Sequence, residues 1–325
     1  MLVSVVVPVY NSEGSLPLLV ERLSRALGPG TQLGELILVN DGSSDQSWCV
    51  IEELVRTHSW IRGFNLMRNY GQHNALLCGI RAARYPIIVT MDDDLQTPPE
   101  EIPRLMAELD KGNDVVYGTP RHQHHGFLRD LASAVTKIAL QSAMGADTAR
   151  KVSAYRIFRT HLREAFAYYS GPHVSIDVLL TWGTQKFSAI PVRNDPRPIG
   201  TSNYTAAKLI AHAVNMITGF STLPLRMASI IGFICTLFGL GVLAFVLGRY
   251  FVQGGSVPGF PFLASMIAVF SGAQLFALGI IGEYLARMHF RMMDRPSYAL
   301  RSSAGATQDE IGATRREPST YVTDA

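Results

Sequence analysis

The sequence predicts an α/β fold with a mostly parallel, doubly wound sheet, followed by two transmembrane helices. Short apolar runs alternate with amphipathic helical patterns over residues 1 to about 120, and acidic residues follow one of these runs directly. Two long stretches without charge lie near the C-terminus. Alternating strand and helix signals favour parallel strands that are joined by crossover helices. The 325 residues are enough for such a domain and a membrane region.

Five short and mostly apolar runs are expected to form strands, and the run 87–91 is rich in β-branched residues. They cover residues 3–8, 35–39, 63–67, 87–91 and 115–117. Apolar residues at helical spacing predict helices over residues 15–27, 46–57 and 74–83. Because a predicted helix separates each of the first four strands from the next, these four strands can lie parallel in one sheet.

Three acidic residues follow the apolar run 87–91 directly. At the end of a buried strand, Asp92, Asp93 and Asp94 would repel one another and lose solvation. A divalent cation would make this arrangement tolerable, and ligands of open α/β sheets bind beyond the carboxyl ends of the strands. The pattern therefore indicates that Asp92 and Asp94 hold Mg²⁺ or Mn²⁺ on a diphosphate. The alternative is an acidic turn, with Asp94 close to a helix N-cap.

A second polar cluster follows the run 35–39. Asp41 stands where this strand ends, and Gly42 can adopt backbone angles that other residues avoid. The carboxylate of Asp41 could accept hydrogen bonds from a ribose or a base. It could equally cap the helix that begins near Gln46, as an Asx-turn.

An amphipathic pattern covers residues 126–145. Arg129, Ser133 and Lys137 recur every four residues and share one helix face. Such a helix can lie at a membrane surface and direct its basic face at phosphate. A solvated face of an ordinary helix is the simpler interpretation of the same pattern.

A second segment of this kind covers residues 202–220. Lys208 lies within it and Arg197 precedes it, so that the two cations flank the turn 200–204. We assign Lys208 to the same phosphate-binding surface as the basic residues of the first segment.

Two uncharged stretches predict membrane-spanning helices. Residues 227–247 and 262–282 each comprise 21 residues without a charge. At about 1.5 Å per residue, such a helix is roughly 31 Å long, which matches the hydrocarbon core of a bilayer. Several arginines follow the second stretch, so both termini are expected in the cytoplasm and the link between the helices outside.

Net charge and cysteine content argue against a nucleic-acid partner, a disulfide framework and a zinc site. The formal net charge is +3 at pH 7, which does not indicate a nucleic-acid-binding surface, and we expect no nucleic-acid partner. Three scattered cysteines form neither a disulfide framework nor a zinc spacing, which suits a reducing compartment. They are Cys49, Cys78 and Cys235.

Six longer motifs stand in one order along the chain. They are SVVVPVYN at 4–11, NDGSSD at 40–45, RNYGQH at 68–73, MDDDLQTPPEEIP at 91–103, LPLR at 223–226 and GEYLAR at 282–287. Together they resemble glycosyltransferase family 2, and within it the membrane-bound polyprenyl-phosphate glycosyltransferases. That group includes the undecaprenyl-phosphate 4-deoxy-4-formamido-L-arabinose transferases and, more distantly, the dolichyl-phosphate mannose synthases. The resemblance covers about residues 1 to 300 and is far more specific than a single Asp-x-Asp.

The resemblance implies a GT-A fold that binds a nucleotide-sugar, preferably UDP-linked, in the crevice of the sheet. The nucleotide-contacting positions of the family are matched by Pro8, Tyr10, Val39, Asp41, Asp93 and Arg197. The catalytic positions are matched by Asp92, Asp94 and Gln96 at the metal and the diphosphate, and by Arg121, which matches a phosphate-facing position of the first interface helix. The positions that face the acceptor phosphate are matched by Arg129, Ser133 and Lys137. The implied cofactor is Mg²⁺ or Mn²⁺, with Asp92 and Asp94 as its ligands.

The implied reaction moves a sugar, with inversion, to polyprenyl (undecaprenyl) phosphate. An oxygen of this phosphate attacks the anomeric carbon, and the nucleoside diphosphate leaves. Because a phosphate monoester has a second pKa of about 6, much of the acceptor is dianionic at neutral pH, and a strong general base is not required. Similar proteins can form tetramers, which makes a homo-oligomer plausible.

These expectations divide the chain into three parts. A cytoplasmic catalytic domain with its interface helices covers residues 1–222, and a two-helix transmembrane region covers 223–290. The cytoplasmic tail 291–325 is polar and is expected to be disordered. The protein is therefore expected in the inner or plasma membrane, which it crosses twice.

Four positions depart from the family pattern. Ser12 stands where relatives often carry a glutamate that contacts the base, and we assign that role to the adjacent Glu13. Asn40 replaces the first aspartate of an Asp-Asp-Gly-Ser motif. Ala154 replaces an aspartate, and Asn203 replaces a lysine that would touch the diphosphate.

Two other functions compete with this interpretation. A processive polysaccharide synthase would need a Gln-x-x-Arg-Trp motif, which none of the tryptophans Trp48, Trp60 and Trp182 completes. A non-catalytic membrane protein that binds nucleotide or lipid phosphate for a glycan-export partner is favoured by the departures at Ala154 and Asn203. The intact Asp-x-Asp and Gln96 weigh against it.

Overall fold

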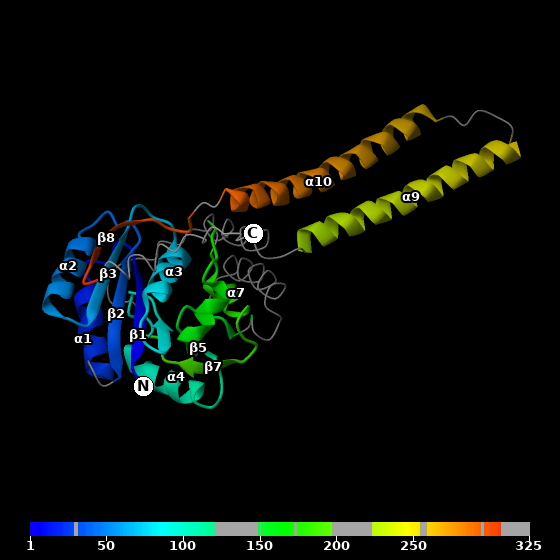
Figure 1. The fold of residues 1–325 in the computed structure, drawn as a ribbon. Coiled ribbons are helices and arrows are strands. Elements are labelled where there is room, and N and C mark those ends of the chain that lie inside the picture. The colour runs from blue at the N-terminus through cyan, green and yellow to red at the C-terminus, as the bar shows by residue number, and fades with distance from the viewer. Residues whose placement is uncertain are drawn as a thin grey trace, which may run out of the picture.

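An α/β domain carries a pair of long helices that project from it side by side (Figure 1). The computed structural model describes residues 1–28, 32–120, 149, 151–171, 174–196, 223–253, 259–293 and 296–306. The two expected interface helices, at about 126–145 and 202–221, lie outside these residues. The same holds for six predicted site residues, which are Arg121, Arg129, Ser133, Lys137, Arg197 and Lys208.

Eight strands form one mixed sheet in the described part of the chain, in the order β7-β5-β6-β4-β1-β2-β3-β8. The strands are β1 (Val3–Val9), β2 (Leu33–Asn40), β3 (Ile61–Leu66), β4 (Ile87–Thr90), β5 (Val115–Pro120), β6 (Arg156–Arg159), β7 (Phe187–Val192) and β8 (Leu300–Ala304). β1 pairs in parallel with both β2 and β4, and β2 pairs in parallel with β3. The predicted parallel core is therefore confirmed. β6 and β8 run antiparallel to their neighbours, and neither strand was predicted.

Helices cover both faces of this sheet, as expected for a doubly wound fold. They are α1 (Leu16–Leu27), α2 (Ser47–Thr57), α3 (Gln72–Ala82), α4 (Ile102–Leu109) and α7 (Ile176–Leu180), with the short 3₁₀ helices η1 (Pro99–Glu101) and η2 (Thr160–Phe166). The side chains of β1 alternate between two cores. Val5 packs with the apolar side chains of α1 and α4, whereas Val6 packs with those of α3 and α7. Because both faces of β1 are buried, its residues are apolar except for Ser4.

The end of the described chain returns to the sheet as β8. β8 pairs antiparallel with β3, and both Tyr298 before it and Leu300 within it are buried. Just before β8, the Ser297 hydroxyl donates to the Gly171 carbonyl over 2.9 Å. The expectation that residues 291–325 are disordered is therefore wrong for this segment. The strand escaped prediction because it contributes backbone hydrogen bonds and few apolar side chains.

The two projecting helices are α9 (Leu223–Gln253) and α10 (Phe260–Met292), which lie antiparallel (Figure 1). Gly239 lets them approach closely, because a Cβ at this position would lie 2.7 Å from Cζ of Phe270. Both helices carry large exposed apolar side chains, for example Phe233 and Leu275. Among the residues that the structure describes, no helix has the length and apolarity required to cross a membrane. The structure therefore does not show the two transmembrane helices that the sequence predicts, and they remain a prediction.

Gly79 provides a test of how closely α3 lies on the sheet. A methyl group at this position would overlap Cγ1 of Val6 and lie 3.2 Å from Cγ2 of Val39. Because the contact is with strand side chains in a closed core, Gly79→Ala should lower the free energy of unfolding by about 1–3 kcal/mol. Thermal unfolding of the full-length protein in detergent measures this. Gly232→Ala is the matched control, since that helical glycine faces open space. An equal effect of both substitutions would contradict the close packing.

Candidate active site

Asp92, Asp93 and Asp94 follow β4 at the carboxyl edge of the parallel strands. All three are half-buried, and each carboxylate is held by a different partner. Oδ1 of Asp92 accepts from the Gln72 side-chain amide at 2.6 Å. Oδ2 of Asp93 accepts from the backbone N–H of Tyr10 at 3.4 Å. The three side chains are therefore held by α3, by the end of β1 and by their own loop.

The electrostatics of this acidic cluster disfavour three full charges. Burial, together with the charges of Asp94 and Asp93, raises the pKa of Asp92 to about 7, against the opposing effects of the Arg156 guanidinium and the Gln72 amide. Burial also raises the pKa of Asp93 to about 6, although the hydroxyl of Ser12 and the N–H of Tyr10 favour its ionised form. A cation among these oxygens would relieve both penalties.

The acidic cluster fits a divalent cation that is completed by a substrate. Within the described residues, no group of three or more carboxylate, histidine or cysteine side chains could hold a metal ion alone. Asp92 and Asp94 would supply two ligands, and water and phosphate oxygens would supply the others. Mg²⁺ is commonly bound in this way, through one or two carboxylates together with substrate phosphates.

The loop after the acidic cluster turns sharply and is held on both sides. Leu95 has φ 59° and is fully buried, which is an unusual conformation for a bulky residue. The carboxylate of Asp94 accepts from the N–H of Gln96 at 3.0 Å. The carbonyl of Gln96 accepts from the N–H of Asp195 at 2.8 Å. These contacts compensate for the strain at Leu95 and set the position of Gln96.

Asp41 binds backbone groups of a neighbouring loop. Its carboxylate oxygens accept from the N–H of Tyr70 at 2.7 Å and of Gly71 at 2.9 Å. Burial raises the pKa of Asp41, although these two N–H groups favour its ionised form. The interpretation of Asp41 as a cap of α2 is therefore wrong. The carboxylate of Asp45 instead accepts from the N–H of Ser47, the first residue of α2, at 3.0 Å.

The predicted nucleotide contacts come together beside the acidic cluster. Pro8 of β1 lies opposite Val39 of β2, and the 43% exposed Tyr10 follows β1. The carboxylate of Glu13 accepts from the N–H of Gln46 at 2.8 Å and so supports the start of α2. The structure thus collects Pro8, Tyr10, Val39 and the aspartates at one edge of the sheet, while binding of a base by Glu13 remains a prediction.

Two residues that the sequence did not single out support Asp92. Gln72, at the start of α3, donates to the carboxylate, and the buried Arg156 supplies a positive charge nearby. Nη1 of Arg156 is paired with Oδ1 of Asp177 at 2.7 Å, and the same oxygen accepts from the Tyr117 hydroxyl at 3.1 Å. Gln72 lies inside the motif RNYGQH at 68–73, and Arg156 lies two residues after the departure at Ala154. Nothing in the local pattern identifies their partners.

Comparison with known proteins identifies the family. The family model described as glycosyl transferase family 2 matches residues 4–167. The chain belongs to glycosyltransferase family 2. This confirms the resemblance and the assignment as a glycosyltransferase.

Two relatives of this family 2 glycosyltransferase match nearly its full length. It is 36% identical over 311 residues to the undecaprenyl-phosphate 4-deoxy-4-formamido-L-arabinose transferase of Yersinia enterocolitica, covering 95% of each chain. It is 36% identical over 306 residues to the protein of that name from Photorhabdus laumondii, covering 93% of this chain and 94% of the other.

A solved structure supports the GT-A-like fold of this family 2 glycosyltransferase. The glucosyl-3-phosphoglycerate synthase of Mycobacterium tuberculosis, in complex with Mn²⁺, uridine-diphosphate-glucose and phosphoglyceric acid, matches with a TM-score of 0.51. The two are 20% identical, and the match covers 67% of this chain and 77% of that chain. At this identity the likeness shows the fold alone.

The raised pKa of Asp92 predicts how stability depends on pH. An aspartate in an unfolded chain has a pKa of about 3.9, whereas that of Asp92 in the folded protein is about 7. Between these values the folded protein binds the extra proton, so its free energy of unfolding falls as the pH rises. Asp92→Asn should reduce this fall and be the more stable form near pH 7 when a chelator removes divalent metal. Denaturant unfolding at several pH values measures the difference.

Asp110→Asn is the control, since Asp110 is an exposed residue at the end of α4. It should leave the pH dependence of the native protein unchanged. Equal pH profiles for the native protein and Asp92→Asn would contradict the assigned burial of this carboxylate.

Proposed function

We propose that the protein transfers a sugar from a nucleotide-sugar, with UDP as the carrier, to polyprenyl phosphate. The observation that carries this proposal is the crowded acidic cluster at the carboxyl edge of β4, next to the ends of β1 and β2. Such an edge suits a nucleoside diphosphate and its cation. The names of the full-length relatives indicate undecaprenyl phosphate as the acceptor, and UDP is the carrier that the family resemblance favours.

The reaction is an inverting displacement at the anomeric carbon. An oxygen of the acceptor phosphate forms the new bond as the bond to the diphosphate oxygen breaks. Asp92 and Asp94 would hold Mg²⁺ or Mn²⁺, and a bound cation would neutralise the charge that develops on the leaving diphosphate. Gln72 fixes the orientation of the Asp92 carboxylate, and Tyr10 fixes that of Asp93.

The acceptor does not need a strong base from the protein. Its phosphate has a second pKa of about 6 and is largely dianionic at neutral pH. The alanine at position 154 is compatible with this chemistry, because no aspartate is needed there as a base. Its carbonyl accepts from the Thr90 hydroxyl at 3.1 Å and from Nε of Arg156 at 3.4 Å. The remaining requirement is to hold two anions close together. We assign this task to Arg121, Arg129, Ser133, Lys137, Arg197 and Lys208.

The helix pair α9 and α10 would keep the domain at its lipid acceptor. α9 begins and α10 ends at the same end of the pair, next to the domain (Figure 1). This arrangement suits a hairpin that crosses the membrane twice and leaves the catalytic domain and both termini in the cytoplasm. Large apolar side chains that would meet lipid are exposed along both helices: Phe233, Leu237, Phe238, Leu240, Phe245, Leu275, Phe276, Leu278 and Leu285.

A transfer assay tests the proposed reaction. The purified full-length protein is incubated with a panel of UDP- and GDP-sugars labelled in the sugar, undecaprenyl phosphate and Mg²⁺ or Mn²⁺. Label should enter the organic phase, and a chelator should prevent this. Asp94→Asn should lower the rate at least about 100-fold, because a metal ligand is lost. Asp110→Asn should transfer at the native rate.

Donor binding without transfer for every sugar of the panel would favour the non-catalytic alternative. A normal rate for Asp94→Asn would contradict the assigned metal site. The panel also identifies the sugar and the nucleotide carrier.

Alkaline carbonate extraction tests the proposed membrane insertion. Membranes from cells that express the full-length protein are washed at high pH, which releases proteins held by charge alone. The protein should stay in the membrane pellet, because two inserted helices cannot dissociate without exposing their apolar faces to water. Release of most of the protein into the supernatant would contradict insertion of α9 and α10.

A further inference from the structure

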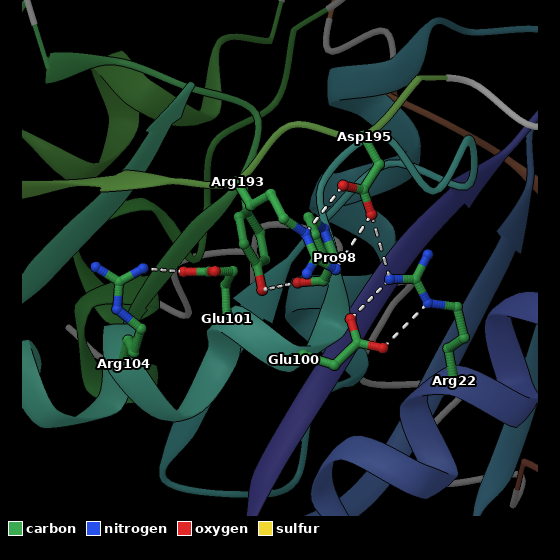
Figure 2. Close-up of polar contacts among 8 residues, drawn as sticks. Arg22, Pro98, Glu100, Glu101, Arg104, Arg193 and Asp195 are labelled. Atoms are coloured by element: carbon green, nitrogen blue, oxygen red, sulfur yellow. Dashed lines mark hydrogen bonds and ion pairs between the residues drawn. The ribbon is translucent and has the colours of Figure 1, made fainter. Parts of the chain in front are cut away.

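Arg22 of α1 bridges two carboxylates that lie far apart in the sequence (Figure 2). Its Nε donates to Oε1 of Glu100 at 3.1 Å, and its Nη2 donates to Oε2 at 2.7 Å. Nη2 also lies 3.7 Å from Oδ2 of Asp195. Asp195 is in turn paired with Arg193, whose Nε lies 2.9 Å from Oδ1. Four charges of alternating sign therefore join α1, η1 and the segment after β7. We refer to Arg22, Glu100 and Asp195 as the Arg22 bridge.

Arg22 is the most sheltered member of this network. Its side chain is 19% exposed, compared with 44% for Glu100 and 30% for Asp195. The planar guanidinium binds Glu100 with two parallel hydrogen bonds, a geometry that a lysine cannot reproduce. Shelter and a bidentate geometry distinguish this network from an ordinary exposed ion pair, which contributes little to stability.

The same helix contains such an ordinary pair. Nη2 of Arg25 lies 2.6 Å from Oε1 of Glu21, and these side chains are 74% and 60% exposed. This pair joins two residues of one helical turn and holds no other segment. Arg25 is therefore a matched control for Arg22.

The two segments that Arg22 joins meet again at Gln96. Glu100 lies in η1, directly after the loop that carries Asp94 and Gln96, and the N–H of Asp195 donates to the carbonyl of Gln96 at 2.8 Å. The N–H of Gln96 donates to Asp94 at 3.0 Å. The Arg22 bridge therefore closes a ring outside the site. Arg22 binds Glu100, the chain leads from Glu100 back to Gln96, and Gln96 binds Asp195, which lies next to Arg22. Leu95, with its strained backbone, directly precedes the part of the chain that this ring encloses.

We propose that Arg22 is a positioning residue for the acidic site. By holding Glu100 and Asp195 together, it fixes the loop of Asp94 and Gln96 against the segment 193–196, which leads to Arg197. Arg22 acts through these contacts and touches no substrate. Its effect on catalysis rests on the proposed function, whereas its effect on the loop does not.

Hydrogen exchange tests the effect on the loop independently of activity. In Arg22→Gln, amides in peptides that cover residues 93–101 and 187–196 should exchange roughly tenfold faster, because both sides of the Gln96 contact open more often. Arg25→Gln should exchange like the native protein in these peptides. Unchanged exchange in Arg22→Gln, or an equal increase throughout the domain, would overturn the proposal.

Steady-state kinetics in the transfer assay test the effect on catalysis. Arg22→Gln should raise the KM for the nucleotide-sugar and the half-saturating Mn²⁺ concentration roughly tenfold, with a much smaller change in kcat, because the loop is displaced but chemically intact. Arg22→Lys should lie between this variant and the native protein, since it restores the charge but not the fork. Arg25→Gln should have native constants.

The KM of a double variant and the stability of the single variants show whether Arg22 positions the loop or only stabilises the fold. Arg22→Gln and Glu100→Gln act on one bridge, so the increase in KM should be about the same in the double variant as in either single variant. Independent, multiplicative effects, or a lower stability with a native KM, would overturn the proposal. If the native protein transfers no sugar at all, the proposed function fails, and the exchange measurement still decides the role of Arg22 in the loop.

Discussion

The crowding of three carboxylates at the carboxyl end of β4 is the constraint on which the rest of the site depends. Burial and mutual repulsion raise the pKa of Asp92 to about 7, and the surrounding structure opposes this increase. An amide from Gln72 and the charge of Arg156 both favour the ionised form. Arg156 can be buried because Asp177 is its partner at 2.7 Å. The site therefore combines a cluster that needs a cation with groups that keep it ready to bind one.

The acidic cluster could be predicted from the sequence because it combines two general features of α/β proteins. An apolar run long enough for a buried strand ended directly in acidic residues, and carboxyl ends of parallel strands meet at one edge. Asp41 and Tyr10 could be placed there for the same reason. The partners of these groups could not be predicted. The carboxylate of Asp41 binds N–H groups 29 and 30 residues away, and no local periodicity reports such a contact.

The close approach of these loops depends on backbone conformations that the sequence only partly reveals. Gly42 has φ 65°, and a Cβ on it would lie 2.5 Å from the backbone carbon of Arg68. Gly71 has φ 97° and precedes α3 directly. The first glycine lets the turn after β2 reach the loop after β3, and the second lets that loop present its N–H groups to Asp41. Gln72 then begins α3 in position to reach Asp92. Two glycines thus link the ends of β2, β3 and β4.

β8 extends this chain of contacts to the helix pair. The strand follows α10 in sequence, and the carbonyl of Ala299 accepts from the N–H of Met67 at 2.9 Å. The guanidinium of Arg301 donates to the carbonyl of Met67 at 3.0 Å. Met67 directly precedes the loop that binds Asp41, so α10 is joined through backbone hydrogen bonds to the edge of the sheet that carries the acidic cluster. Backbone pairing of this kind tolerates a polar sequence, because the hydrogen bonds and not the side chains hold the strand in place. The helix pair and the acidic cluster are therefore parts of one connected structure, although nothing in the sequence between residues 296 and 306 resembles the motifs of either.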